Sequence, residues 1–390
     1  MNLAALKFTP SPRMRRIFTA LALMGAAAFV AALFAAPARA WANFLLVSYY
    51  LLGLGVASLF FVAMQYASHA GWSIALRRIP EAVAAIIPIV AVGMVIVVFL
   101  RPSLYPWVGS LHAEPHSALA FKAFWLNLPF FQARTILYLL LWILFGVAII
   151  RTSRRQDADG HLTHTRRNVR LSIAFIVVFA VTLWLASFDW LMSLEPHWYS
   201  TLFGVYNFAG LFLSGQAAGI IILVWLQRAG YLREAVTENH LHDLGKLLFA
   251  FSTFWAYIWF SQYMLIWYAN IPEETAHFVR QQRGVWGLLF ILNLMLNWVI
   301  PFFILLPRAT KRSPYVMAKV AGVVLLGRWL DLYLQIFPSV VGNEPVFGVW
   351  EIGMMLGGVG VFGLLTLRAL AKAPLLPIKD PLLVESLSHH

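Results

Sequence analysis

The sequence predicts an all-α, polytopic membrane protein with about ten transmembrane helices. Hydrophobic residues make up 61% of the 390 residues and charged residues only 12%, and the mean hydropathy is +0.76. A soluble domain cannot bury that much apolar surface. The apolar residues also gather in runs of about 20, the length with which a helix crosses about 30 Å of hydrocarbon. Runs of that length favour helices over a barrel, because a helix satisfies its own backbone hydrogen bonds in lipid.

The first apolar run, residues 17–36, is longer than the hydrophobic part of a typical signal peptide, so we expect an uncleaved helix. The nine runs that follow lie at residues 41–66, 81–100, 124–150, 171–191, 201–226, 247–270, 285–306, 315–337 and 346–367. We expect two four-helix bundles plus a flanking helix pair. Together they form a single integral membrane domain over residues 1–390, with spans between about 17 and 367. Residues 373–390 contain three prolines and predict an irregular cytoplasmic tail.

The basic residues predict the orientation of the chain. Most of the 29 lysines and arginines fall at the N-terminus, in every second connection and in the C-terminal tail. The exceptions are Arg134 and Arg328 inside spans, and Arg39, Arg101, Lys122, Arg280 and Arg283 in the opposite connections. Positive charge gathers on the cytoplasmic side of membrane proteins. We therefore expect a multi-pass protein of the bacterial inner membrane with both termini cytoplasmic. The net charge of +13 is spread between the spans, so it does not indicate nucleic-acid binding.

The connection at residues 187–201, in the middle of the chain, carries the polar groups of most interest. It is too short to form a domain, yet it holds Asp189, Glu195, His197 and two tryptophans. Two acids at the mouth of a membrane bundle indicate proton handling. The alternative is a polar hairpin capped by interface tryptophans. The other outer connections add acids and histidines that a solvated rim explains equally well: His112, Glu114, His116, Glu273, Glu274, His277 and Glu344.

Charged residues within the predicted spans are further candidates, because a charge in hydrocarbon is costly. Arg328 and Asp331 lie three residues apart, hence on one helical face, and Gln335 continues that face. They predict an internal ion pair, with a place in a proton path as the second interpretation. Arg134 has no acid partner within its own helix.

Span 247–270 carries a stripe of polar side chains. Lys246, Thr253, Tyr257, Ser261 and Tyr268 are spaced 7, 4, 4 and 7 residues apart, which places them on one side of a helix. Such a stripe is expected to face protein or water. It fits either a hydrogen-bonded proton wire or contacts between helices.

The residue types that hold redox cofactors are missing or misplaced. The chain has no cysteine, which excludes disulfides and an iron–sulfur cluster held by its own thiolates. All eleven histidines lie in connections or at span ends, whereas a haem between membrane helices usually takes histidines from within spans. No phosphate-binding glycine loop, HExxH motif or nucleophile elbow occurs. We therefore expect no bound metal and no redox cofactor in this chain.

Three stretches resemble a known family. They are residues 187–208 (SFDWLMSLEPHWYSTLFGVYNF), 242–274 (HDLGKLLFAFSTFWAYIWFSQYMLIWYANIPEE) and 328–339 (RWLDLYLQIFPS). All three are similar to the ActF-type membrane subunits of alternative complex III, a respiratory quinol:cytochrome c oxidoreductase. More broadly, the chain resembles the NrfD/PsrC-like membrane proteins over nearly its whole length.

This resemblance implies ten helices in a subunit that carries no redox cofactor, is not catalytic alone, and conducts or couples protons. It implies as partners a related NrfD-like membrane subunit, an iron–sulfur subunit, c-type cytochrome subunits and, as a further candidate, a terminal oxidase. Haem c and iron–sulfur clusters would lie in those partners, and a quinol or quinone is a candidate ligand. A secondary transporter and a passive membrane anchor for redox subunits are the alternative functions.

The intramembrane charges and their place in the matching stretches give the candidate site residues. Asp189 and Asp331 are candidate proton carriers, with Arg328 as an electrostatic gate. The full proton-pathway set is Asp189, Glu195, His197, Tyr257, Ser261, Arg328 and Asp331. The quinone-binding candidates are Asp189, Trp190 and His197.

Overall fold

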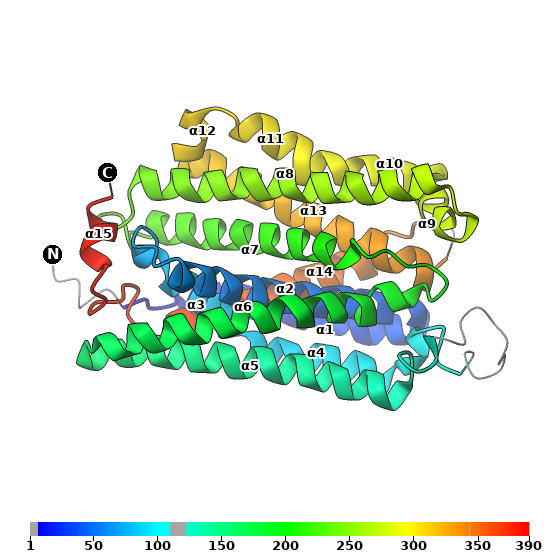
Figure 1. The fold of residues 1–390 in the computed structure, drawn as a ribbon, viewed down its shortest axis with the longest axis horizontal. Helices are drawn as coiled ribbons and strands as arrows, with labels where there is room; N and C mark the ends of the chain where they lie inside the picture. The colour runs from blue at the N-terminus through cyan, green and yellow to red at the C-terminus, as the bar shows by residue number, and fades with distance from the viewer. Residues whose placement is uncertain (1–6, 110–121, 343, 390) are drawn as a thin grey trace.

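The computed structural model describes residues 7–109, 122–342 and 344–389, and this part of the chain forms a polytopic, all-α bundle (Figure 1). It contains nine helices that are long and apolar enough to span a membrane. They are α1 (Pro12–Ala35), α2 (Pro37–Ala67), α3 and α4 (Arg78–Ala84 and Ile87–Leu100), α5 (Leu128–Asp159), α6 (Leu162–Trp190), α7 (Phe203–Arg228), α10 and α11 (Gly284–Leu294 and Ile300–Leu305), α13 (Pro314–Val340) and α14 (Val349–Leu370). The prediction of an all-α membrane fold is confirmed.

The predicted span 247–270 lies within helix α8 (Glu238–Ala269). With 32 residues α8 is among the longest helices, and it runs beside α7 (Figure 1). It is not one of the nine, because it has the length of a span but not the apolar composition. Its tyrosines, tryptophans, serines and glutamine lower its hydropathy.

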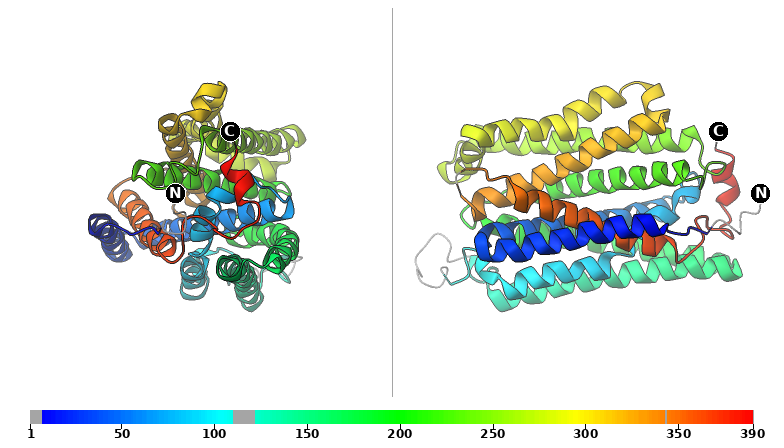
Figure 2. Two further views of the ribbon diagram at one scale, coloured as in Figure 1. Left: turned by 90° about the vertical axis from the view of Figure 1, so that its left-hand side faces the viewer. Right: turned by 180° about the vertical axis from the view of Figure 1, so that it is seen from behind.

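The long helices form two four-helix bundles and a flanking pair, as predicted. In the first bundle, α2, α4, α5 and α6 each contact the next around a ring. In the second bundle, α7, α8, α10–α11 and α13 do the same. Helix α2 joins the bundles through its contacts with α7 and α13. Helices α1 and α14 pair with each other and pack against α2, as the two views of Figure 2 show.

Proline and capping side chains fix where several helices begin. Ser11, Asn127 and Ser313 each stand immediately before a helix that has proline at its first or second position. Their side chains accept hydrogen bonds from the backbone N–H three residues on, which satisfies donors that the first helical turn leaves free. Gly160 ends α5 at a φ of 75°, a conformation that glycine adopts without strain.

Glycines allow α1 and α14 to approach closely. A Cβ atom added at Gly25 would lie 2.3 Å from the Cα atom of Gly357, and one at Gly357 would lie 2.5 Å from the Cα atom of Gly25. The backbones therefore touch at this point. In a membrane, where no hydrophobic effect drives helices together, such contact provides the van der Waals packing that holds a pair.

Both described ends of the chain lie at the same end of the bundle, which we call the terminal end (Figure 1). Lys7 forms an isolated backbone bridge with Pro374 there. The tail that begins at residue 373 contains the short helix α15 (Leu383–Leu387) and buries Leu376. At the opposite end, α6 continues into the 3₁₀ turn η5 (Met192–Leu194), and α9 (Pro272–Gln282) caps the second bundle. The terminal end also holds α12 (Arg308–Arg312).

Candidate functional site

Asp189 is the centre of a buried ionic cluster in the first bundle. It lies in the last turn of α6 and is 0% exposed. The Arg134 guanidinium on α5 donates to both carboxylate oxygens, over 2.9 Å from Nε to Oδ2 and 2.8 Å from Nη2 to Oδ1. Trp125 Nε1 and the Tyr138 hydroxyl add bonds of 2.8 and 3.0 Å. The acid partner of Arg134 is thus on the neighbouring helix.

Trp190 fills the core of the first bundle rather than lining an open site. Its ring is 0% exposed and packs edge-on against Trp142, with centroids 5.8 Å apart. Its indole N–H donates to Thr135 Oγ1 over 3.0 Å. His197, by contrast, is exposed in the connection that follows α6. The quinone-binding candidates therefore point into different surroundings.

Glu195 anchors a second cluster at the end opposite the termini. Its carboxylate is 2.9 Å from His277 Nδ1 and 2.7 Å from Arg280 Nη2, both on α9, and it accepts a 2.6 Å bond from Ser339 Oγ on α13. Burial by itself would raise the pKa of Glu195, but His277, Arg280 and Ser339 together lower it to about 2. The carboxylate is therefore ionised throughout the physiological range. Trp198 stacks on the His277 ring at 4.0 Å.

Asp331, about two thirds of the way along α13, is the centre of the third cluster. It is 1% exposed and pairs with Arg328, which is 2% exposed, one turn earlier. The Tyr206 hydroxyl on α7 donates to the same carboxylate. Asn293 Nδ2 on α10 and Gln335 Nε2 on α13 donate as well, each over 3.2 Å. The predicted ion pair is present, and three neutral donors surround it.

Two glycines provide the space for Arg328 and for the nearby Asn297. A Cβ atom at Gly210 on α7 would lie 2.5 Å from Arg328 Nη1, so the guanidinium occupies the place of a side chain. From there Arg328 Nη2 donates over 3.1 Å to Asn207 Oδ1. A Cβ atom at Gly327 would lie 2.8 Å from Asn297 Oδ1. Because both helices expose backbone here, two polar side chains fit inside the bundle.

A line of polar groups continues from Asp331 toward the terminal end. Asn297 Nδ2 donates to Asn293 Oδ1 over 2.7 Å. Asn297 lies in the π-helical turn η6 (Met295–Val299) between α10 and α11. Four residues on, Pro301 lacks the N–H that would bond the Asn297 carbonyl. Ser252 Oγ on α8 donates to that carbonyl instead, over 2.5 Å. π-Helical turns of this kind are common at functional sites.

A small cavity lies between the Glu195 and Asp331 clusters. Its volume is about 20 Å³, and His277, Gln281, Asp331 and Gln335 are among the residues that line it. Gln281 Nε2 is 3.1 Å from His277 Nε2. The side-chain oxygens of Gln262 and Gln335 are buried at the cavity without a hydrogen-bond partner. A space of this volume with several polar partners suits one water molecule.

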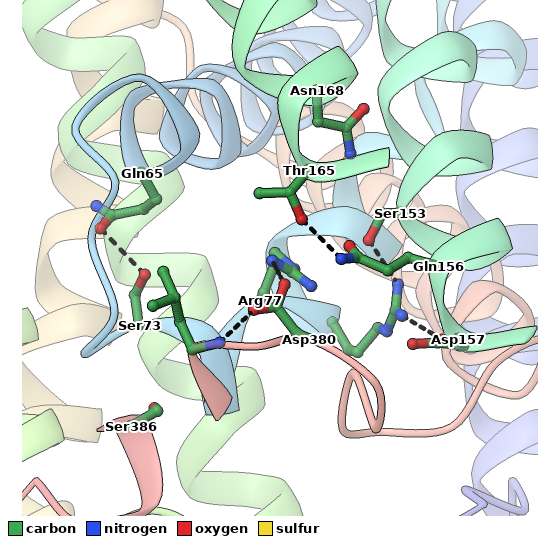
Figure 3. A network of polar contacts seen from close by, with 12 residues as sticks. Gln65, Ser73, Arg77, Ser153, Gln156, Asp157, Thr165, Asn168, Asp380 and Ser386 are labelled. Atoms are coloured by element: carbon green, nitrogen blue, oxygen red, sulfur yellow. Dashed lines mark hydrogen bonds and ion pairs between the residues drawn. The ribbon is translucent and has the colours of Figure 1, made fainter. Parts of the chain in front are cut away.

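A fourth cluster lies at the terminal end, around Glu81 at the start of α3. Glu81 is 1% exposed, pairs with Arg77 and Arg78, and accepts a 2.6 Å bond from Ser153 Oγ. Arg77 also pairs with Asp380 of the tail, with Nη1 and Oδ2 2.7 Å apart, as Figure 3 shows. The tail is thereby held across the end of the first bundle.

The hydroxyl stripe of α8 lies outside all four clusters. The structure places Tyr257 63% exposed and Tyr268 83% exposed on the outer surface of the second bundle. Ser261 is half-buried on the same face. The sequence reasoning placed this stripe against protein or water. Within this chain it faces outward, because the interior is contacted by the opposite face of α8, with Ser252, Trp255 and Gln262.

Sequence reasoning brought together Arg328 with Asp331 but missed most of their surroundings. Tyr206 and Asn207 lie on α7 and Asn293 lies on α10, helices that the sequence does not pair with Arg328 and Asp331. The i, i+4 spacing of Asn293 and Asn297 was the available signal. Three of the outer acids and histidines lie outside the described residues: His112, Glu114 and His116. In the part of the chain that the structure describes, no group of three or more acids and histidines is arranged to hold a metal ion.

Comparison with models of protein families finds no match for this chain, and comparison with curated proteins finds none either.

Proposed function

We propose that this chain is the proton-conducting membrane subunit of a quinol-oxidising respiratory complex of the alternative complex III type. Its place would be the bacterial inner membrane, with both termini cytoplasmic, as the distribution of basic residues indicates. The observation that carries the proposal is the buried Arg328–Asp331 pair in the second bundle, which polar groups connect to Glu195 at one end.

The route runs through the second bundle in three steps. At the outer end, His277 exchanges a proton with water while the Glu195 and Arg280 charges orient it. A water in the small cavity then carries the proton between His277 and Asp331, both of which line that cavity. Asp331 holds the proton. Arg328 pairs with this carboxylate, so a proton that arrives there breaks a buried ion pair, and its transfer is coupled to an outside change in potential or charge.

Beyond Asp331, Asn293 and Asn297 lead toward Ser252 and the terminal end. Amide side chains do not release protons at physiological pH, so they orient water rather than carry charge. The Asp189–Arg134 cluster lies in the other bundle and would respond to the same redox event as a second carrier.

Electron transfer is assigned to partner subunits. The chain has no cysteine and no histidine within the predicted spans, so haem c and iron–sulfur clusters would belong to the partners. Oxidation of a quinol releases two protons with its electrons, and a proton-conducting subunit of the same complex would couple its proton movement to this reaction. Quinol oxidation itself fits the related membrane subunit better, because Trp190 is packed into the core here.

The outward stripe of α8 supports a membrane partner. Tyr257, Ser261 and Tyr268 place hydroxyl groups on the surface of a membrane helix. Interhelical hydrogen bonds of hydroxyl side chains are a common means of helix association in lipid. A helix of the related NrfD-like subunit would cover this face.

Purification of the chain from its native membrane tests the proposal first. Haem c and iron–sulfur signals should co-purify with it, whereas a secondary transporter would purify without them. In the purified complex, Asp331→Asn should abolish or strongly lower proton movement coupled to quinol oxidation.

The matched control is Glu351→Gln. Glu351 is also 0% exposed, and its carboxylate is bound by Arg39 over 2.6 Å, but it lies in the flanking pair, off the proposed route. Coupled proton movement should survive this change. A passive anchor would retain full coupling in both variants, which would refute proton conduction.

A further inference from the structure

A large cavity lies between the flanking helix pair and the two bundles. Its volume is about 470 Å³, within the range of about 300–1,000 Å³ usual for ligand pockets. Helices α1, α2, α7, α13 and α14 all line it. It is separate from the cavity near Asp331 and shares no lining residue with it.

The lining suits a hydrocarbon ligand. Almost all of its side chains are aliphatic, phenylalanine, methionine or glycine. The Tyr50 hydroxyl, one of the few polar groups, already donates to the Leu325 carbonyl over 2.8 Å. None of the described residues that line the cavity is charged. Water would therefore find few partners there, and an apolar chain would gain contacts.

Two buried donors on residues that line the cavity have no hydrogen-bond partner within the described part of the chain. Trp329 is 8% exposed and Thr366 is 4% exposed. The indole Nε1 of Trp329 and the hydroxyl of Thr366 are both shielded from solvent and unbonded. Such groups are usually satisfied in folded proteins, and both belong to residues that line the cavity, so they are the donors that a ligand bringing an acceptor would satisfy.

The cavity is long enough to hold one lipid chain. The lining positions on α14 run from Met355 to Leu370, which at about 1.5 Å per residue is roughly 22 Å along the helix axis. One leaflet of the hydrocarbon core is about 15 Å thick. Thr366 lies about one turn from the end of α14, whereas Trp329 lies about halfway along α13.

We propose that this cavity binds a single hydrocarbon chain of a membrane lipid whose carbonyl oxygen accepts a hydrogen bond from the wall. Phospholipids and isoprenoid quinones share this chemistry. A phospholipid would place its ester carbonyl at Thr366, near the terminal end. A quinone inserted ring-first would place its ring carbonyl at Trp329. The proposal is independent of proton conduction, since none of the acids on the proton route lines this cavity.

Photolabelling of the full chain, purified in the complex in which it occurs, tests the inference. One probe is phosphatidylethanolamine with a diazirine in one acyl chain, and the other is an azido-substituted isoprenoid benzoquinone. Labelled peptides are mapped by mass spectrometry. At least one probe should label the cavity residues of α13 and α14 in the wild type.

Gly322→Phe fills the cavity, because a Cβ atom at Gly322 meets no atom within 4 Å. It should lower the cavity labelling at least tenfold. Gly219→Phe is the matched control, since Gly219 is also in a helix with no atom within 4 Å of its Cβ position but lies off this cavity. Labelling should be unchanged there.

Two conservative variants distinguish the sources and guard against misfolding of Gly322→Phe. Loss of phospholipid labelling in Thr366→Val identifies a phospholipid, and loss of quinone labelling in Trp329→Phe identifies a quinone. Absence of cavity labelling by both probes in the wild type would overturn the inference. So would labelling that none of the three cavity variants changes.

Discussion

The ion pair at the centre of the second bundle gives the sharpest prediction. Asp331→Asn removes the counter-charge of Arg328, whose side chain is only 2% exposed. Removal of one partner of a buried pair costs about 3–5 kcal/mol, because the other charge stays buried and unpaired. The new amide also places an NH2 donor at one of the two oxygen positions, so it faces either the Tyr206 hydroxyl or the Gln335 amide, each of which donates to the carboxylate in the wild type. One lost hydrogen bond adds about 1 kcal/mol.

Removal of both charges should recover much of the stability that the single variant loses. Replacement of a buried ion pair by neutral groups of similar volume is often neutral or stabilising. We expect the free energy of unfolding of the Arg328→Met, Asp331→Asn double variant to lie within about 2 kcal/mol of the wild-type value and well above that of either single variant. The assay is equilibrium unfolding in mixed detergent micelles, followed by tryptophan fluorescence. If the double variant loses as much unfolding free energy as the two single variants together, the energetic coupling between Arg328 and Asp331 is refuted.

Three further predictions concern packing and pH. Gly210→Ala should lower the free energy of unfolding by about 1–3 kcal/mol in the same assay, because the added Cβ lies 2.5 Å from Arg328 Nη1; an unchanged stability would show that the guanidinium moves freely. Gly357→Val should separate α1 from α14, since its Cβ would meet the Gly25 backbone at 2.5 Å; proteolysis should then cut α1 faster than in the wild type, and equal rates would contradict the close packing. Glu195→Gln removes a carboxylate whose pKa is lowered from 4.5 to about 2. Above about pH 5, the free energy of unfolding of the wild type should therefore exceed that of the variant by up to roughly 3 kcal/mol. That advantage should fall away as the pH drops toward 2, and a difference in thermal stability that stays constant from pH 7 to pH 3 would contradict the assigned contacts.

Hydropathy and helical spacing predicted the helices and one ion pair. Long apolar runs marked the spans because lipid admits little else. Arg328 and Asp331 could be paired because both lie on one turn of one helix. Arg134 and Asp189 could not, since 55 residues separate them and only the packing of α5 on α6 brings them together.

The orientation of α8 was beyond sequence reasoning for a physical reason. The helix has polar side chains on two faces, one with Tyr257 and Ser261 and the other with Ser252 and Gln262. Periodicity shows that each set shares a face but not which face the neighbours cover. In the structure, Ser252 and Gln262 face the interior of the bundle, and both are buried.

The role of Pro301 depends on tertiary structure in the same way. Its sequence position shows that the Asn297 carbonyl loses a helical partner. Only the fold shows that Ser252, on another helix, replaces it. The same holds for the cavity beside Asp331, whose lining comes from α7, α8, α9, α10 and α13.

The most direct test of proton conduction is the number of protons moved per quinol oxidised by the tag-purified complex in liposomes, compared between wild type and the Arg328→Met, Asp331→Asn double variant. We expect that variant to stay within about 2 kcal/mol of the wild-type free energy of unfolding, so a change in the ratio reports on conduction rather than on folding. We expect quinol oxidation to continue while coupled proton movement is lost. An unchanged ratio would contradict a proton path through Asp331.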